Sequence, residues 1–217
     1  MSHKFGVVIL AAGASSRLGR PKQLLPYLGK TLVEHAARTA IASGADEVVV
    51  VVGADASAVK EKLKGLKIRI VHNADWAEGM GSSVRHGVGA LSGDIECVVL
   101  ALCDQPRMTP DLLRDLAVRH FESGAPIVAS SYDGVIGAPS AFGQIHFADL
   151  MSLRGDSGAR EIIRRSPNPV ETVSFSGGNV DVDTPADYLK LVPPPEVGCA
   201  TDGVFQPKNA RAPPIGC

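Results

Sequence analysis

The segment that follows the first apolar run of the chain has the composition of a polyphosphate site. Leu10 to Lys22 reads Leu-Ala-Ala-Gly-Ala-Ser-Ser-Arg-Leu-Gly-Arg-Pro-Lys. Small residues let the backbone approach a ligand closely, and Gly13 allows the positive φ that such a turn often needs. Converging amides and the charges of Arg17 and Lys22 suit an anion. The predicted phosphate-contacting residues are Leu10, Ala11, Ala12, Gly13, Arg17 and Lys22.

Two familiar phosphate loops do not match this segment. The dinucleotide fingerprint G-x-G-x-x-G needs a third glycine in another frame, and G-x-x-x-x-G-K-[ST] needs Gly-Lys-Ser or Gly-Lys-Thr. Here Gly13 is followed after five residues by Gly19-Arg-Pro-Lys. The alternative is a solvated Gly-Ser turn. This alternative is disfavoured because an apolar run, a glycine and two cations occur together.

Two carboxylates are candidate metal ligands. Asp104 ends an apolar run, so we expect its side chain at the sheet edge that carries the phosphate loop. Proteins usually hold Mg²⁺ with one or two carboxylates plus phosphate oxygens. Asp183, in Asp-Val-Asp-Thr-Pro, is the candidate partner, and its alternative is to cap the helix that begins at Pro185. Asp181 shares a side of an extended segment with Asp183, so spacing leaves open whether it touches the metal too.

A third segment begins a predicted helix after Glu78-Gly-Met-Gly81. Helix starts supply free amides and a partial positive charge for a base, ribose or phosphate. The start of this helix, with Ser82 and Ser83, is therefore a candidate nucleotide contact. The alternative for the serines is an ordinary helix N-cap.

The elements that would position these groups follow an α/β pattern. Near-continuous apolar runs predict parallel strands covered on both faces, and stretches with helical spacing lie between them. The predicted strands are 5–12, 48–53, 68–72, 95–102 and 126–130, and the predicted helices are 31–43, 55–64, 82–91 and 109–123. Their alternation predicts a doubly wound, mainly parallel, Rossmann-like α/β sheet.

After residue 131 the predicted strands and helices no longer alternate regularly. Residues 132–142 are punctuated by glycine and proline, 157–165 and 185–191 read as helices, and 170–175 and 179–182 read as strands. From residue 193 the chain has many prolines and little periodicity. We expect one domain over 1–192 and a flexible extension over 193–217, whose role the sequence does not indicate.

Composition excludes several classes of protein. The chain has 217 residues, of which 22 are Lys or Arg and 23 are Asp or Glu, so no basic surface for nucleic acid or an anionic membrane is implied. The four cysteines form no C-x-x-C pair, which favours a reduced, cytoplasmic setting. The apolar N-terminal run imitates a signal peptide, but it leads straight into the cationic loop. No apolar run approaches the ~20 residues of a membrane span.

The sequence resembles the molybdenum cofactor cytidylyltransferase family of nucleotidyltransferases over roughly residues 5–191. The opening signature, L-A-A-G-x-S-x-R-x-G-x-P-K-x-L-L-P, spans 10–26. Further matches lie at 79–87, 102–106, 137–139, 155–160 and 181–187. The opening signature is specific for the superfamily, and Gly-x-Pro with Gly-Asp-x-Gly-Ala-Arg points to this branch. The resemblance implies the nucleotide-diphospho-sugar transferase type of fold and places the second metal ligand at Asp183. It also implies that Gly81, Ser82 and Ser83 lie around the nucleobase of the nucleotide.

The resemblance implies transfer of CMP from CTP to the phosphate of molybdenum-molybdopterin, with release of pyrophosphate. Lys22 would then contact the α-phosphate, Arg17 and the loop amides the β and γ groups, and Asp104 with Asp183 the Mg²⁺. It also implies a molybdenum hydroxylase or its chaperone as a protein partner. The residues expected to face the pterin are Gly137, Pro139, Asp156 and Arg160, with turn and helix-start roles as the alternatives.

Two other functions stay open at this point. One is a nucleotidyltransferase that uses GTP or ATP, or acts on another small phosphate. The other is a carrier that binds nucleotide and cofactor without turnover. The carrier is disfavoured by the presence of Lys22, Asp104 and Asp183. No Ser-His or Cys-His pairing supports covalent hydrolase chemistry. The preferred nucleobase, the oligomeric state and the role of the extension are not indicated by the sequence.

Overall fold

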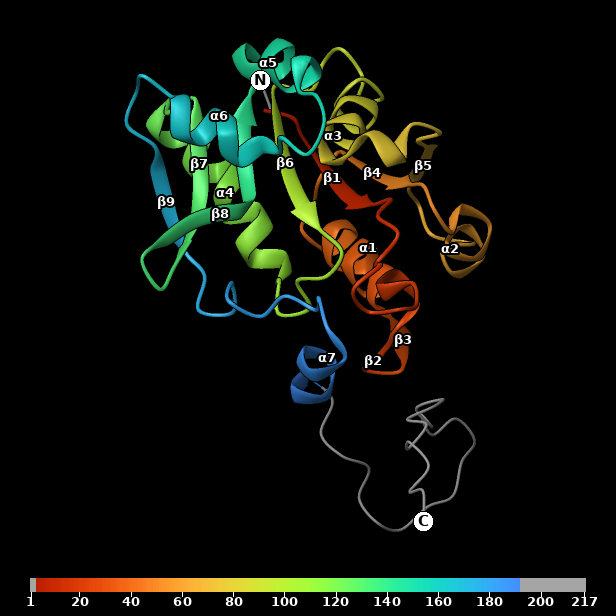
Figure 1. Cartoon of the computed structure of the whole chain (residues 1–217). Helices are drawn as coiled ribbons and strands as arrows, with labels where there is room; N and C mark the ends of the chain where they lie inside the picture. Colours follow the sequence, from red (N-terminus) through yellow and green to blue (C-terminus); the bar gives the residue numbers. More distant parts are fainter. Residues whose placement is uncertain (1–2, 192–217) are drawn as a thin grey trace, which may run out of the picture.

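The computed structural model describes residues 3–191 (Figure 1). The expected extension over 193–217 lies outside the described residues, so the boundary of the domain predicted over 1–192 stays a prediction. Within the described range a seven-stranded sheet has the order β5-β4-β1-β6-β8-β7-β9. The strands are β1 (Phe5–Ala11), β4 (Glu47–Val52), β5 (Arg69–His72), β6 (Cys97–Leu102), β7 (Ile127–Tyr132), β8 (Val135–Gly143) and β9 (Glu171–Ser174).

Most neighbouring strands of this sheet run parallel. β1 lies between β4 and β6 and is parallel to both, and β5 and β9 are parallel to β4 and β7. Only β8 is antiparallel to its neighbours β6 and β7. The strands in the centre are buried almost throughout, because helices cover both faces of a parallel sheet. The predicted mainly parallel α/β sheet is therefore confirmed.

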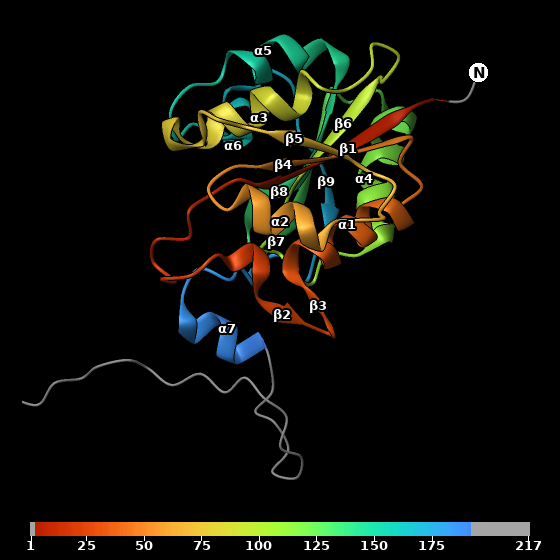
Figure 2. The ribbon, with the colours of Figure 1, turned by 90° about the vertical axis from the view of Figure 1, so that its right-hand side faces the viewer.

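Helices form a layer on each face of the sheet (Figure 2). On one face α1 (Leu32–Ala42), α2 (Ala56–Lys62) and α4 (Pro110–Ser123) share a core with β1, β4 and β6. On the other face α3 (Met80–Val88), α5 (Phe147–Ser152) and α6 (Ala159–Arg165) pack around Val8, Val49 and Phe142. The last described helix, α7 (Pro185–Leu191), contacts a small separate cluster.

Helices α1, α2 and α4 begin within one residue of the predicted positions, whereas α3, predicted over 82–91, spans Met80–Val88. The Thr31 side chain accepts a hydrogen bond from the Glu34 amide at 3.4 Å, and that of Thr109 accepts one from Leu112 at 3.2 Å. Such N-caps satisfy amides that have no partner inside the helix. Helix α4 ends at Gly124, whose φ of 68° is the left-handed conformation typical of a C-terminal glycine.

The second half of the chain departs from expectation in two places. The stretch that contains several glycines and prolines forms strand β8, which pairs with β7 in an irregular register. Ser130 lies opposite Gly137, but the next residue of β7, Ala129, lies opposite Ser140, so residues 138 and 139 of β8 have no ladder partner on β7. This irregularity accommodates Pro139, which lacks the amide proton of a regular ladder. The strand predicted over 179–182 is wrong, since that segment is neither strand nor helix. Instead it is held by the Val182 amide, which donates to the Asp104 carbonyl at 3.1 Å.

The sequence also left several short elements unassigned. These are the hairpin β2 (Pro26–Tyr27) and β3 (Lys30–Thr31), helix α5, and the single turns η1 (Lys22–Leu24), η2 (Trp76–Glu78) and η3 (Gln144–His146). Each is too short to show a hydrophobic period. Among residues 3–191, no helix combines the length and the apolar character that a bilayer span requires.

A glycine on α3 sets the distance between that helix and the sheet. A Cβ at Gly87 would lie 2.3 Å from Val8 Cγ1 on β1 and 3.0 Å from Val51 Cγ2 on β4. We expect Gly87→Ala to lower the free energy of unfolding by about 1–2 kcal/mol, because overpacking outweighs the helix propensity of alanine. Urea unfolding measures this change.

Gly93→Ala is the matched control, since a Cβ at Gly93 has no atom within 4 Å. Its unfolding free energy is expected to stay within about 0.5 kcal/mol of the parent protein. Equal losses of unfolding free energy in the two variants would show that the close contact of α3 with β1 does not restrict the size of the side chain at position 87.

Candidate active site

A cavity of about 360 Å³ opens where β1 and β6 end. In a parallel sheet the carboxyl ends of neighbouring strands meet at one edge, which is where α/β folds bind ligands. The cavity is lined by residues 10–14, Lys22, Gln23, Trp76, Ala77, Gly79, Met80, Ser83, residues 102–104 and Asp156. The predicted phosphate loop and Asp104 therefore border the same space.

The loop after β1 is anchored by Gln23, a residue that the sequence analysis did not single out. Its side-chain Nε2 donates to the carbonyls of Ala11 at 3.1 Å and Gly13 at 2.7 Å, and the residue is 1% exposed. The Ser15 hydroxyl accepts the Lys22 amide at 3.0 Å and donates to Gln23 Oε1 at 3.4 Å. These contacts tie both ends of the loop to β1. The only hint in the sequence was the position of Gln23 directly after the loop lysine.

The turn conformation falls on different residues than expected. Ser15 and Gly19 have positive φ, at 53° and 72°, whereas Gly13 does not. The expectation of a positive φ at Gly13 was therefore wrong. A Cβ at Gly13 would have no atom within 4 Å. The absence of a side chain at this position therefore leaves open space at the wall of the cavity. Leu18, in the middle of the loop, is buried against Leu25 and Val182.

Lys22 lies between two carboxylates from distant parts of the chain. Its Nζ donates to Asp104 Oδ2 and, at 3.0 Å, to Asp183 Oδ1. Arg17 donates to the other oxygen of Asp183 at 3.0 Å. The Lys22 and Asp104 side chains are 19% and 11% exposed, so this pair is largely withdrawn from water. The four predicted residues form one cluster with balanced charge.

The cluster shifts the pKa values of its members. Burial alone would lower the pKa of Lys22, but the attraction of Asp104 and the hydrogen bonds to Asp104 and Asp183 outweigh it and raise that pKa. The hydrogen bond from Lys22 lowers the pKa of Asp183. Lys22 and Asp183 are therefore both charged at neutral pH. Burial raises the pKa of the Cys103 thiol to about 12, so this neighbour of Asp104 is not a thiolate nucleophile.

The carboxylates fit a divalent cation that takes its other ligands from a bound phosphate. Asp104 Oδ1 is buried and has no hydrogen-bond partner among the described residues, whereas its other oxygen contacts Lys22. No group of three or more His, Cys, Asp or Glu residues within 3–191 could hold a metal alone. Mg²⁺ is commonly bound by one or two carboxylates together with substrate phosphates, and Asp104 with Asp183 matches that donor set.

Helix α7 has its own cap, so Asp183 is not needed for that purpose. Thr184 Oγ1 accepts the Asp187 amide at 3.3 Å, and Asp187 Oδ2 accepts the Thr184 amide at 3.0 Å. This reciprocal pair satisfies the helix start. Asp181 lines a different cavity, where burial and the charge of Asp104 raise its pKa.

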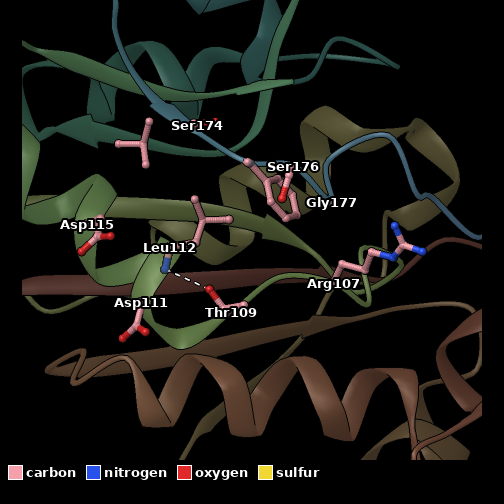
Figure 3. A pocket seen from close by; sticks show the side chains of 10 residues that line it. Arg107, Thr109, Asp111, Leu112, Asp115, Ser174, Ser176 and Gly177 are labelled. Atoms are coloured by element: carbon pink, nitrogen blue, oxygen red, sulfur yellow. Dashed lines mark hydrogen bonds between the residues drawn. The ribbon is translucent and has the colours of Figure 1, made fainter. Parts of the chain in front are cut away.

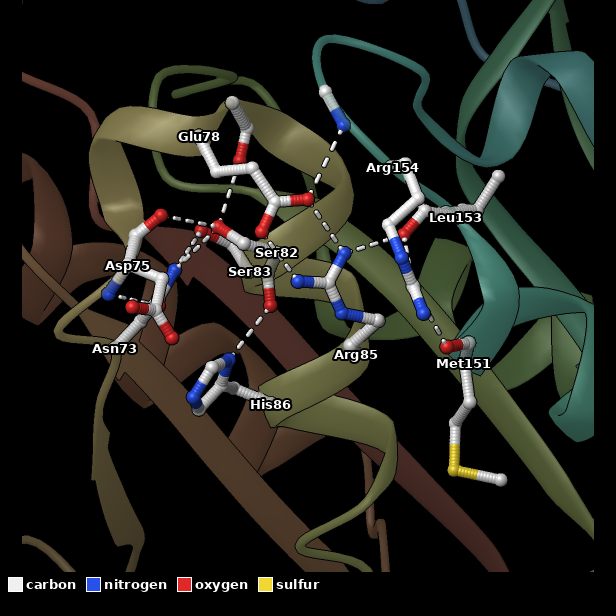
Figure 4. Close-up of polar contacts among 12 residues, drawn as sticks. Asn73, Asp75, Glu78, Ser82, Ser83, Arg85, His86, Met151, Leu153 and Arg154 are labelled. Atoms are coloured by element: carbon white, nitrogen blue, oxygen red, sulfur yellow. Dashed lines mark hydrogen bonds and ion pairs between the residues drawn. The ribbon is translucent and has the colours of Figure 1, made fainter.

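The start of α3 is held by a buried amide network (Figure 4). Asn73 Nδ2 donates to the hydroxyls of Ser82 at 2.8 Å and Ser83 at 3.0 Å, and its Oδ1 accepts the Asp75 amide at 2.9 Å. Ser82 in turn donates to the carbonyls of Asp75 and Gly79. Of the three predicted residues at this helix start, Ser83 borders the cavity, whereas Ser82 and Gly81 do not. Sequence reasoning missed Asn73, which no motif marks.

The segment before α3 is fastened to a second loop at 153–156 (Figure 4). Arg85 forms a two-point ion pair with Glu78, at 2.9 and 2.6 Å, and donates to the Leu153 carbonyl. The Gly81 amide donates to the Gly155 carbonyl at 2.9 Å. Gly79 has φ 122°, and a Cβ there would lie 2.4 Å from the Gly155 backbone. The cavity wall at 76–80 therefore depends on a close backbone contact that glycine alone permits.

A second cavity, of about 260 Å³, adjoins the first and shares Leu10, Met80 and Leu102 with it. Gly137 and Arg160, predicted to face the pterin, line this second cavity. Asp156 borders the first cavity instead, and Pro139 lines neither. Three of the four residues therefore border the two adjoining cavities, and Pro139 does not.

A third cavity, of about 310 Å³, lies between the start of α4 and the end of β9 (Figure 3). Asp111 and Asp115 contribute two carboxylates to it, and Arg107 lies at the opposite end from Asp115. It contains none of the residues of the phosphate loop. None of the residues that the sequence predicts to be functional lines this third cavity.

Comparison with known proteins places the chain in one family. The sequence profile described as the MobA-like NTP transferase domain matches residues 7–170. A protein named nicotine blue oxidoreductase from Paenarthrobacter nicotinovorans is 38% identical over 197 residues, 85% of this chain and 95% of that one. The molybdenum cofactor cytidylyltransferase of Escherichia coli is 24% identical over 184 residues, which cover 84% and 92% of the two chains.

Solved structures give the same picture. Rv0371c from Mycobacterium tuberculosis is 30% identical and superimposes with a TM-score of 0.78, covering 88% of this chain and 98% of that one. A further structure of Rv0371c, with a TM-score of 0.72, is a complex with manganese. The fold is the Rossmann-like nucleotide-diphospho-sugar transferase type, as the resemblance implied, and a divalent metal binds within this family.

Removal of the central lysine should leave buried carboxylate charge without a partner. We expect Lys22→Met to lower the free energy of unfolding at pH 7 by about 2–3 kcal/mol. The lowered pKa of Asp183 means that the ion pair stabilises the fold above the ordinary carboxyl pKa of 3.8 and loses this effect as the pH falls through the lowered value. The gap between parent and variant should therefore narrow below pH 4.

Urea unfolding from pH 2.5 to pH 7 measures that gap. Lys60→Met, at an exposed position of α2, is the control and should change the unfolding free energy by less than about 0.5 kcal/mol throughout. A Lys22→Met deficit that is independent of pH would contradict the role of the carboxylates.

The contact at Gly79 predicts a local effect of substitution. Gly79→Ala should speed hydrogen exchange of amides in 76–83 by about tenfold or more, because the segment must move away from Gly155. Gly65→Ala is the control, since Gly65 also has a positive φ, 77°, but no atom lies near its Cβ position. If both variants leave exchange in 76–83 unchanged, the close backbone contact does not hold this wall.

Proposed function

The chain belongs to the MobA-like NTP transferase family, and we propose that it transfers CMP from CTP to the phosphate of a molybdopterin-type acceptor, with a divalent cation, Mg²⁺, and release of pyrophosphate. The observation that carries the proposal is the cluster of Lys22, Asp104 and Asp183 at the mouth of the first cavity. The adjoining second cavity supports a second substrate beside the nucleotide. The resemblance of the sequence and the relative in Escherichia coli support this acceptor.

The reaction needs two negatively charged partners to be brought together. A phosphate monoester is mostly dianionic at pH 7, because its second pKa is about 6, so it attacks the α-phosphorus without a general base. The forming bond joins an acceptor oxygen to the α-phosphorus, and the breaking bond releases pyrophosphate. Catalysis then rests on alignment and on neutralisation of charge.

The residues of this chain divide that work between them. Lys22 holds the α-phosphate, and Arg17 with the amides of the loop binds the β and γ groups. Asp104 and Asp183 hold the divalent cation, which supplies positive charge to the triphosphate when bound. Ser83 and the wall at 76–80 enclose the nucleoside side of the cavity. The phosphates replace carboxylates as partners of Lys22 when the nucleotide enters.

Related functions differ from this one in a measurable way. A GTP- or ATP-using nucleotidyltransferase, or one that acts on another small phosphate, would use the same cluster with a different nucleobase or acceptor. A carrier would bind nucleotide and cofactor without releasing pyrophosphate. A molybdenum hydroxylase or its chaperone is the protein partner that would receive the product. A cytoplasmic setting agrees with the reduced Cys97 and Cys103, which are free and buried.

The 38% identity to the protein named nicotine blue oxidoreductase favours a second candidate, an oxidoreductase that acts on nicotine blue. Against it stands the cation-bearing loop in place of the dinucleotide fingerprint. Oxidation of NADH or NADPH by nicotine blue in the presence of the protein, without CTP, would support this candidate over nucleotidyl transfer.

Pyrophosphate release tests the proposal. With CTP, Mg²⁺ and molybdenum-molybdopterin, the parent protein should release pyrophosphate, and Lys22→Ala or Asp104→Asn should lower the rate by about a hundredfold or more, since each removes charge stabilisation of the transition state. Lys60→Ala should leave the rate unchanged. Competition among CTP, GTP and ATP then identifies the nucleobase.

An undiminished rate in Lys22→Ala or Asp104→Asn would remove these residues from catalysis. Strict preference for GTP would replace CTP in the proposal. Tight binding of nucleotide and acceptor with no pyrophosphate would establish the carrier instead.

A further inference from the structure

The walls of the second cavity are mostly apolar. They include Val84, Leu100 and Ile163, and Tyr132 adds an aromatic ring. Its volume of about 260 Å³ lies just below the range of about 300–1,000 Å³ that is typical of pockets for drug-sized ligands. A cavity of this size and lining suits one ring system rather than a whole nucleotide.

Gln105 lines this cavity and carries an unpartnered acceptor. The residue is 2% exposed, and its Oε1 is buried with no hydrogen-bond donor among the described residues. Its Nε2 donates to the Ala138 carbonyl at 3.2 Å, which orients the amide. A buried carbonyl without a donor lowers stability, and a ligand N–H in the cavity would satisfy it.

Asp181 lines the same cavity and provides a second acceptor next to the first. Its side chain is hydrogen-bonded to that of Gln105. The Val182 amide holds this segment against Asp104, the neighbour of Gln105. Asp183, two residues further on, contacts Lys22 in the adjoining site, so the two carboxylates serve different cavities.

We propose that Gln105 and Asp181 are specificity-determining residues that select an acceptor whose planar ring carries adjacent N–H groups. A carboxylate binds two parallel N–H groups well, as it does those of a guanidinium, and the amino-pyrimidinone edge of a pterin has the same arrangement. A ring with a carbonyl at that edge would face carboxylate and amide oxygens and would be rejected. The inference rests on the proposed function only in identifying this ring as part of the acceptor.

Binding of two matched rings tests the inference without any turnover. Pterin has an amino group where lumazine has a carbonyl, so lumazine keeps the ring N–H at that edge but loses the adjacent amino N–H. The full-length protein should bind pterin about tenfold or more tightly than lumazine in equilibrium dialysis, because a site built to accept two adjacent N–H groups discriminates strongly against an analogue that lacks one of them.

Two variants then assign the discrimination to its residues. Gln105→Met removes the acceptor at similar volume and should reduce the preference for pterin. Asp181→Asn introduces an amide donor and should raise the affinity for lumazine while it lowers that for pterin. Gln144→Met, at an exposed position of η3, is the control and should keep the parent ratio. Thermal unfolding of each variant verifies that it is folded.

Three results would overturn the inference: equal affinities in the parent protein, no binding of either ring at millimolar concentration, or a parent-like ratio in both variants. Pyrophosphate release with the complete acceptor is measured in parallel. Release without ring discrimination would overturn this inference and leave the proposed transfer standing. Ring discrimination without release would overturn the transfer and leave the specificity of the cavity standing.

Discussion

The ion-pair cluster around Lys22 is the interaction on which the site depends. It joins three segments that are far apart in the chain, the loop after β1, the end of β6 and the segment before α7. Lys22 and Asp104 are largely withdrawn from water, so removal of either side chain leaves the charge of the other poorly compensated. The same balance prepares the site for a highly charged ligand. A cation and a triphosphate can replace the internal pairing without leaving buried charge uncompensated.

The walls of the site are positioned mainly by neutral contacts, together with the ion pair between Arg85 and Glu78. Gln23 holds the loop through two backbone carbonyls, and Asn73 holds two serines at the start of α3. Gly79 allows the backbone at 79 to lie against Gly155. Buried amide networks of this kind are rigid because each unsatisfied group would carry a desolvation cost. The charged side chains therefore meet the ligand from a fixed frame.

The arrangement of the two cavities follows from the topology of the sheet. β6 has the parallel β1 on one side and the antiparallel β8 on the other, so the two spaces open on either side of the end of β6. Asp104 and Gln105 are consecutive, yet one faces the phosphate loop and the other the second cavity. A reaction between two bound molecules needs such adjacency, because proximity supplies much of the rate.

Local patterns in the sequence were sufficient for the parallel strands, the main helices, and the loop that contains Arg17 and Lys22. These features depend on hydrophobic period, capping side chains and spacing, which a single segment carries by itself. Strand β8 and the irregular segment at 179–182 were not predictable, because they depend on pairing with distant strands. Gln23, Asn73 and Gln105 gained their roles only through contacts across the fold. Their partners are mostly backbone carbonyls and hydroxyls that no local pattern specifies, so the tertiary structure alone decided which polar groups are buried together.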